Sequence, residues 1–227
     1  MEIDILSLFP EYFNGPFNVS IIKRALERKI IEIRQVNIRD FSKDKHKKVD
    51  ERPYGGGPGM VMTPQPISDA IKSVRKKDSH LIYLSPQGTP LTSLKCKELA
   101  RYPHLILLCG HYEGIDARVK VDEEISIGDY VLTNGAPAAC VLIDATIRFI
   151  PGVLGNENAM GEDSFEELPF EGPQYTRPDE FEGIKVPEIL KSGNHAEIKK
   201  WRASQGMQKV KRVRPDLLKK EKNCELR

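Results

Sequence analysis

Three glycine-containing turns hold most of the residues with which this sequence could bind a small molecule. Each turn follows a short apolar run of the kind that forms a buried strand. The turns are Ser85 to Gly88, Gly110 to Asp116 and Ser126 to Gly135. In an open α/β sheet, ligands bind beyond the carboxyl ends of the strands. We therefore expect the three turns to form the wall of one small-molecule pocket.

The chemistry of these turns fits an uncharged ring better than a phosphate. They lack the glycine spacing of a dinucleotide fingerprint and contain no lysine or arginine. Backbone amides and carbonyls could hold adenine, with Ile127, Leu132 and Pro86 against the ring. Glu113 and Asp116 could meet a cationic or ribose-bearing ligand, or could cap a helix that follows them. Each turn, taken alone, could also be purely structural.

Another glycine-rich segment, Tyr54 to Met60, is not a phosphate-binding P-loop. That motif ends in Lys followed by Ser or Thr, and neither follows Gly59. The segment lies in a stretch without periodicity, Arg39 to Met62, and such a long connection is usually functional. It could be a flap or a backbone contact to a nucleotide, or a structural turn. The same stretch contains Lys43, Lys45, His46, Lys47 and Lys48.

The elements that would position the turns alternate between strand and helix. This alternation favours a parallel sheet covered by helices. Thr63 is the expected N-cap of one helix, with Pro64 at its first position. The expected strands are Ile3–Phe9, Ile31–Asn37, 81–84 and 105–109, and the expected helices are Asn18–Lys29, Pro64–Val74, Ser93–Tyr102 and Ala136–Phe149.

The pattern changes after Pro151. Residues 152 to 183 are rich in glycine, proline and acidic residues. This composition is typical of an interdomain linker followed by irregular structure at the start of a second region. A short helix is expected at Pro187–Lys191. A stronger one is expected at His195–Ser204 with Asn194 as its N-cap, and Pro215 opens a last basic helix.

The charge is distributed unevenly along the 227 residues. Residues 191 to 227 contain twelve basic and four acidic residues, a balance of +8, whereas the remainder has a balance of −6. A basic tail on an acidic body favours a polyanionic partner such as nucleic acid, with a solvated surface helix as the alternative.

The composition indicates a cytosolic protein. Charged residues make up 30% and hydrophobic residues 39%, and no apolar run is long enough for a membrane helix. The N-terminus lacks the basic start of a signal peptide. The four cysteines, Cys96, Cys109, Cys140 and Cys224, show no paired spacing and read as reduced thiols. The five histidines are scattered and predict no metal cluster.

Several segments together resemble one known family. In this order they cover nearly the whole chain, and they are similar to the bacterial tRNA (guanine-N1)-methyltransferase family TrmD, of the knotted SPOUT superfamily. So many matching segments make a chance resemblance negligible. The segments are Arg52 to Met60, Tyr83 to Gly88, Gly110 to Asp116, Ser126 to Leu132, Arg148 to Gly155, Glu162 to Phe165, Tyr175 to Pro178 and Leu190 to Ile198.

The resemblance implies an α/β fold whose parallel-sheet domain ends in a trefoil knot, which no sequence pattern predicts because knots are rare exceptions. Residues 1–160 would be the knotted S-adenosylmethionine-binding domain, 161–174 an interdomain linker and 175–227 a small, basic, helical tRNA-binding domain. The family implies a cytoplasmic homodimer with active sites shared between chains. The reaction would transfer a methyl group from S-adenosylmethionine to N1 of guanosine 37, beside the anticodon of a tRNA.

The resemblance places S-adenosylmethionine on the three turns. The family's general base falls on Asp163 and its essential arginine on Arg148. The family also needs magnesium, whose ligands are unassigned, although Glu113 and Glu171 are carboxylates in suitable regions. The implied cofactor-binding residues are Tyr83, Leu84, Ser85, Pro86, Gly110, Tyr112, Glu113, Ser126, Ile127, Gly128, Tyr130, Leu132, Asn134 and Gly135.

The two catalytic assignments make chemical sense. Guanine N1 carries a proton at neutral pH, so a carboxylate must take that proton as N1 attacks the methyl group. Negative charge then grows on O6, where a guanidinium can stabilise it. Without the resemblance, Asp163 would read as a solvated carboxylate and Arg148 as a partner of a helix dipole.

The chain departs from the family pattern at several positions in the turns. His111 stands where the family usually has arginine, and Ala117 and Ala136 where it usually has acids. Asn134 replaces a glycine, and asparagine tolerates a left-handed backbone better than most residues. The alternatives are a knotted methyltransferase acting on another RNA and a non-catalytic RNA-binding relative with a decayed cofactor site.

Overall fold

The computed structural model describes residues 1–155, 161 and 163–218. The chain divides into two compact units, Met1–Gly155 and Asn156–Arg227. Cys224 and the end of the basic helix expected from Pro215 lie outside the described residues, as does Glu162.

The first unit is built on a parallel five-stranded sheet with the order β2-β1-β6-β5-β7. The expected α/β fold with a parallel sheet is therefore confirmed. Because all five strands run in the same direction, their carboxyl ends lie at one edge of the sheet. The strands are β1 (Glu2–Ser7), β2 (Glu32–Asn37), β5 (Ser79–Pro90), β6 (His104–Cys109) and β7 (Glu123–Ser126).

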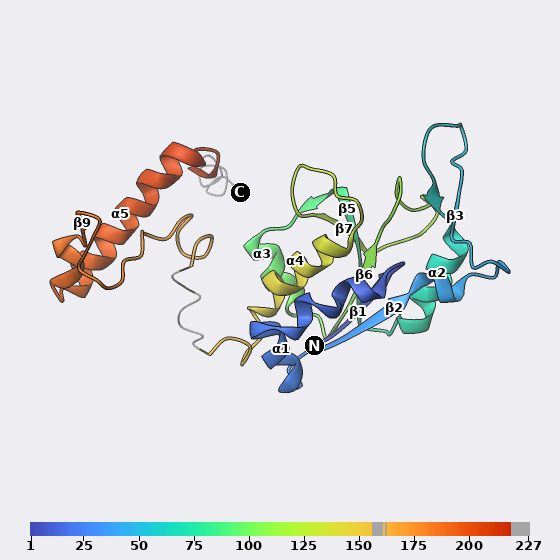
Figure 1. The fold of residues 1–227 in the computed structure, drawn as a ribbon, viewed down its shortest axis with the longest axis horizontal. Helices are drawn as coiled ribbons and strands as arrows, with labels where there is room; N and C mark the ends of the chain where they lie inside the picture. The colour runs from blue at the N-terminus through green and yellow to red at the C-terminus, as the bar shows by residue number, and fades with distance from the viewer. Residues whose placement is uncertain (156–160, 162, 219–227) are drawn as a thin grey trace. The chain divides into compact units, whose positions relative to one another are not determined.

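Helices cover both faces of this sheet (Figure 1). Alternate residues of the strands enter two separate cores, so Leu105 and Leu107 of β6 join one and Ile106 the other. The first core contains α1 (Ser20–Glu27), α3 (Ser93–Leu99) and α4 (Ala136–Ile147), and the second contains α2 (Pro64–Val74). Both faces are buried, which explains why β6 reads as a continuous apolar run.

Short elements complete the first unit. Three 3-10 helices follow β1 and β2, and a small antiparallel pair, β3 with β4, precedes α2. Thr63 is the N-cap residue of α2 as expected, but its hydroxyl donates to the carbonyl of Val49, 3.1 Å away, instead of capping. These elements are η1 (Pro10–Asn14), η2 (Pro16–Asn18), η3 (Ile38–Phe41), β3 (Asp50–Glu51) and β4 (Val61–Met62).

The second unit is organised around α5 (His195–Val213). Asn194 is its N-cap, as expected, and Oδ1 of Asn194 accepts a hydrogen bond from the amide of Glu197. The helix is preceded by the hairpin of β8 (Glu180–Phe181) and β9 (Ile184–Lys185) and by the 3-10 helix η5 (Glu188–Lys191).

Several expected ends differ by one to three residues, and two elements extend much further than expected. The helix expected to end at Ser204 continues to Val213, because Gly206 is not a helix breaker but a close contact. A Cβ at Gly206 would lie 2.2 Å from the carbonyl oxygen of Phe170, so only glycine lets this backbone pack on the helix. The strand expected at 81–84 runs from Ser79 to Pro90 and contains the first glycine turn as an irregularity.

Candidate functional site

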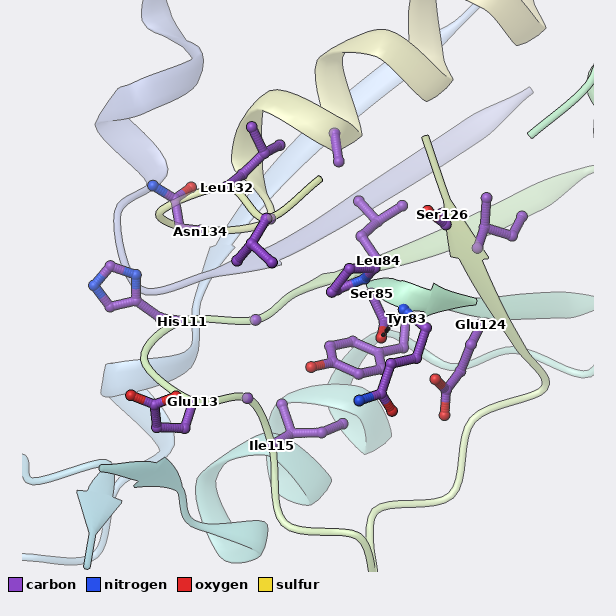
Figure 2. A pocket seen from close by; sticks show the side chains of 18 of the residues that line it. Tyr83, Leu84, Ser85, His111, Glu113, Ile115, Glu124, Ser126, Leu132 and Asn134 are labelled. Atoms are coloured by element: carbon purple, nitrogen blue, oxygen red, sulfur yellow. Dashed lines mark hydrogen bonds between the residues drawn. The ribbon is translucent and has the colours of Figure 1, made fainter. Parts of the chain in front are cut away.

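The three glycine turns form the wall of one cavity of about 410 Å³ at the carboxyl edge of the sheet (Figure 2). All fourteen residues that the family resemblance implies as cofactor contacts line it. Several further lining residues lie outside that implied set. These are Gln87, His111, Gly114, Ile115, Asp116, Ala117, Val119, Glu124, Ile125, Val131, Thr133 and Ala138.

The first turn is a bulge inside a strand and not its end. Leu84 and Thr89 of β5 both face Ile125 of β7, so the four residues between them are looped out of the ladder. Within the bulge, the Ser85 hydroxyl accepts a hydrogen bond from the amide of Gln87 at 3.2 Å. The bulge therefore releases backbone polar groups towards the cavity while β5 stays paired on either side.

The second turn follows β6 and takes an unusual backbone path. Tyr112 has φ of +57°, a left-handed conformation that is uncommon outside glycine. No helix follows this turn among the described residues, so the expectation that Glu113 and Asp116 could cap one was wrong. Beneath the turn, burial raises the pKa of the Tyr83 phenol, with a further contribution from the negative charge of Glu124.

The third turn leads from β7 into α4. Ser126 holds its start, because its hydroxyl donates to the Gly128 carbonyl at 3.0 Å and accepts from the Gly128 amide at 3.2 Å. Gly128 has φ of +155°, and a Cβ there would lie 2.4 Å from the ring of Tyr130. The turn needs glycine at this position for both reasons.

The end of the third turn packs against the end of β6. The Gly135 amide donates to the Gly110 carbonyl at 2.9 Å, and a Cβ at Gly135 would lie 2.9 Å from Cα of Cys109. Asn134 is not among the residues with positive φ. Its Oδ1 instead accepts a hydrogen bond from the Ala136 amide at 2.8 Å, so the asparagine that replaces the family's glycine helps to start α4.

The glycine-rich segment is continuous with the cavity wall. The Met60 carbonyl accepts from the Glu113 amide at 3.0 Å, the Met62 amide donates to Gly114, and the Met62 carbonyl accepts from the Asp116 amide. These hydrogen bonds give the end of the segment a structural role, which is one of the interpretations that the sequence left open. Tyr54, at its start, is fully exposed.

Carboxylates dominate the charge of the cavity wall, where Glu113, Asp116 and Glu124 all line it. The Arg118 side chain hydrogen-bonds the Asp116 carboxylate and lowers its pKa to about 2. Glu124, which faces Tyr83 across β5 and β7, was not expected from the sequence, because only strand pairing brings it to the turns. Within the described part of the chain, no three histidine, cysteine or acidic side chains group into a metal site.

Arg148, one of the two implied catalytic residues, lies outside the set of residues that line the cavity. Arg148 is exposed and is the C-cap residue of α4, whereas the cavity touches this helix only near its start, at Gly135 and Ala138. Asp163 belongs to the second unit, where its carbonyl accepts from the amide of Glu166 at 3.3 Å.

None of the helices that the structure describes has the length and apolar character needed to cross a bilayer. The three cysteines of the described region, Cys96, Cys109 and Cys140, are free thiols, as expected.

The chain is similar to known proteins over almost its full length. Residues 1–220 match the family described as tRNA (Guanine-1)-methyltransferase TrmD. The tRNA (guanine-N(1)-)-methyltransferase of Protochlamydia amoebophila is 60% identical, with 96% of this chain and 100% of that protein covered. That of Ruminiclostridium cellulolyticum is 53% identical, with both chains fully covered.

A longer relative shows the same similarity over part of its length. The tRNA (guanine-N(1)-)-methyltransferase of Chlamydia pneumoniae is 57% identical over 96% of this chain, which spans 61% of that protein. The expectation drawn from the sequence motifs is thereby confirmed, and the chain belongs to the TrmD family of tRNA (guanine-N1)-methyltransferases.

Proposed function

We propose that this protein transfers a methyl group from S-adenosylmethionine to N1 of guanosine 37, next to the anticodon of a tRNA. The observation that carries the proposal is the gathering of all fourteen expected cofactor residues around one cavity. Membership of a family of tRNA (guanine-N1)-methyltransferases supplies the reaction class.

The cavity suits S-adenosylmethionine. Its wall combines apolar side chains, such as Leu132 and Ile127, with backbone groups of the three turns, which together can hold an adenine ring. Carboxylates line the same cavity and favour a cationic ligand. When bound, S-adenosylmethionine supplies a methyl group on a positively charged sulfur that becomes a neutral thioether after transfer.

The protein's own residues would make guanine N1 reactive. Asp163 would accept the N1 proton as the methyl group is attacked, since the protonated nitrogen is a poor nucleophile. Arg148 would stabilise the negative charge that grows on O6. The cavity would hold the acceptor and donor in line and exclude water, which removes much of the entropic barrier.

The position of Arg148 supports a shared active site in a homodimer. The helix α4 spans twelve residues, Ala136–Ile147, with the cavity at its start and Arg148 after its end. A helix of this length measures roughly 18 Å. The cavity extends along α4 to Ala138, so roughly 15 Å of helix lies between its lining and Arg148. We propose that Arg148 serves the cavity of a second copy.

The knot and the domain division follow from the same family. We propose that residues 1–160 form the knotted cofactor domain, that 161–174 link it to the rest and that 175–227 bind tRNA. The hydrogen bond from Gly135 back to Gly110 supports the knot, because the chain returns to β6 after leaving through β7. The +8 balance of residues 191–227 supports a role in binding a polyanion in the cytoplasm, where tRNA is modified.

Magnesium is expected to assist turnover with ligands unassigned. Magnesium commonly keeps several waters and uses only one or two protein carboxylates together with the substrate. The wall carboxylates Glu113 and Glu124 fit such partial ligation.

A direct test is methyl transfer from labelled S-adenosylmethionine to a tRNA with guanosine at position 37, followed by mapping of the methylated nucleotide. We expect label at N1 of guanosine 37. Label at another nucleotide or on ribosomal RNA would favour a different RNA substrate. Absence of S-adenosylmethionine binding by calorimetry would indicate a non-catalytic relative.

Complementation tests the shared site. We expect Arg148→Gln and Gly128→Val to be inactive separately, the first for lack of the guanidinium and the second because its cavity is blocked. Mixed dimers would contain one intact cavity facing one intact Arg148, so co-expression should restore part of the activity. No recovery in a purified mixed dimer would contradict the shared site.

A further inference from the structure

The first unit carries a compact basic loop that the proposed reaction does not use. This basic loop, defined as residues Lys43–Lys48, follows β2 and η3, and all six of its residues are exposed. It contains four lysines, one histidine and one acid, Asp44. If this loop were flexible, its composition would indicate only a solvated surface. A fixed backbone would instead hold the lysines in place for a ligand.

The backbone of the basic loop is fixed by hydrogen bonds. Oδ1 of Asp44 accepts from the amides of His46, at 2.7 Å, and Lys48, at 3.3 Å. The Ser42 hydroxyl donates to the Lys48 carbonyl and accepts from the Asp44 amide. The one acidic side chain of the loop is thus engaged with the loop's own amides, and those hydrogen bonds lower the pKa of Asp44.

The loop is also anchored at both ends. Before it, the Phe41 carbonyl accepts from Nε2 of Gln65 on α2 at 2.8 Å. After it, Val49 is completely buried, and its carbonyl accepts from the Thr63 amide at 2.8 Å. Figure 1 shows this connection beside α2. The lysine side chains therefore project from a preorganised backbone, which reduces the entropy lost when they bind a ligand.

Two lysines of the loop have no carboxylate partner among the described residues. Lys43 pairs with Asp69 at 3.4 Å and Lys48 pairs with Glu51 at 2.7 Å. Within the described part of the chain, Nζ of Lys47 donates to the carbonyl oxygen of Asp40, at 3.4 Å, and Lys45 has no ion pair. These two ammonium groups keep their charge available for an anionic partner.

The sheet topology places the basic loop at the same edge as the cavity. The strand β2 is parallel to β6, β5 and β7, so the chain that leaves β2 emerges where the three glycine turns lie. Only β1 separates β2 from β6, and neighbouring strands are about 4.8 Å apart. The same connection then continues through β3 to Met60, whose carbonyl accepts from the Glu113 amide, and on into β4.

We propose that the basic loop is a second RNA contact, in which Lys45 and Lys47 hold backbone phosphates near the nucleotide that enters the cavity. The inference rests on the proposed function, and it adds an RNA-binding surface on the cofactor-binding unit to that expected from the basic C-terminal region. Lysine ammonium groups act as point charges on phosphates, so the loop positions the RNA and does not read its bases.

The test compares Lys45→Gln/Lys47→Gln with a matched control, Lys29→Gln/Lys77→Gln. Lys29 has the same φ of +56° as Lys47, and both control lysines are exposed. They precede β2 and β5 and thus lie at the opposite edge of the sheet. Each double variant removes two positive charges, so a difference between them reports position and not net charge.

We expect the loop variant to weaken tRNA binding roughly three- to twenty-fold, as for two solvent-exposed charge pairs. The slope of log K against log salt should become shallower by about 0.7–0.9 for each phosphate that the protein no longer neutralises. The rate at saturating tRNA and the affinity for S-adenosylmethionine should not change. The control variant should match the wild type in all four measurements.

Equal tRNA affinity and salt slope in the loop variant and the wild type would overturn the inference, as would equal losses in both double variants. A loss of S-adenosylmethionine affinity in the loop variant would also count against it, since it would indicate a disturbed cavity. Failure of the wild type to methylate tRNA would instead refute the proposed function. The binding measurements compare variants with the wild type, so they distinguish this outcome from a failure of the inference.

Discussion

The guanidinium of Arg34 holds the buried carboxylate of Asp4 through two hydrogen bonds of 2.7 Å each. Asp4 has no exposed surface, and its Oδ2 also lies 2.8 Å from Nε2 of His104. On the far side of the imidazole, Nδ1 of His104 lies 2.7 Å from the Ser79 hydroxyl. The network joins β1, β2, β6 and the start of β5, at the edge of the sheet opposite the cavity.

Removing the carboxylate from this network should destabilise the protein. Asp4→Ala would leave the imidazole and the guanidinium without their buried partner, and breaking such a pair costs about 3 kcal/mol. Urea denaturation followed by circular dichroism would measure the change. Lys23→Ala, which breaks an exposed pair with Glu27 at 3.7 Å, is the control and should have little effect. Equal stability of Asp4→Ala and wild type would refute the structural importance of the network.

Substitution of the proposed base, Asp163, or of the proposed catalytic arginine, Arg148, should affect transfer without affecting cofactor binding. Asp163→Asn should reduce the rate of methyl transfer by about 100-fold or more, and Arg148→Gln by roughly 100- to 1000-fold. Single-turnover kinetics and calorimetry with S-adenosylmethionine would separate the two properties. Glu167→Gln, an exposed carboxylate near Asp163 in sequence, should retain activity. Activity retained by Asp163→Asn would exclude that residue as the base.

The pair of Asp116 and Arg118 should be visible in a pH titration. The guanidinium lowers the pKa of Asp116 to about 2, against roughly 3.9 in an unfolded chain. A lowered pKa stabilises the folded state above the unfolded value, and this contribution is lost as the pH falls through about 2. Carbon-13 NMR of the carboxyl group should show that low midpoint.

Arg118→Gln should move the midpoint of Asp116 up towards the unfolded value. The stability of the variant should depend less on pH between the two midpoints, because the difference between the folded and unfolded pKa of Asp116 becomes smaller. The amide of residue 118, which donates to Oδ1 of Asp116 at 2.9 Å, remains in the variant. An Asp116 midpoint unchanged by Arg118→Gln would show that another group depresses it.

The thiols of Cys109 and Cys140 should react slowly. Burial raises the pKa of Cys140 to about 11 and raises that of Cys109 further. Since only the thiolate is nucleophilic, alkylation of Cys140 at pH 8 should be roughly 100-fold slower in the folded protein than in urea. Peptide mapping by mass spectrometry would follow each cysteine. Rapid alkylation of the half-buried Cys140 in the folded protein would contradict its raised pKa.

Removal of divalent cations should lower turnover more than cofactor affinity. The described residues offer no group of three ligands for a tightly held metal, and magnesium commonly binds together with a substrate. Methyl transfer and calorimetry with and without EDTA would separate the effects. A large loss of S-adenosylmethionine affinity in EDTA would instead indicate a metal required for the cavity itself.

The sequence alone predicted four of the five strands of the parallel sheet and, through the family resemblance, fourteen of the residues that line the cavity. A continuous apolar run predicted β6, and an N-cap residue followed by proline predicted the start of α2, since both signals are local. The glycines of the third turn marked positions where a side chain would collide, as the contact of Gly135 with Cys109 shows. The cofactor residues were expected from motifs that resemble the family, because hydrophobic periodicity does not identify binding residues.

Only the tertiary structure decided which distant residues meet. Strand pairing brings Glu124 opposite Tyr83, and the close approach of Phe170 keeps Gly206 inside a continuous helix. The length of α4 separates Arg148 from the cavity of its own chain. The parallel order of the strands places the basic loop at the edge that holds the cavity. Such relationships depend on contacts between residues far apart in the chain, which local propensities do not encode.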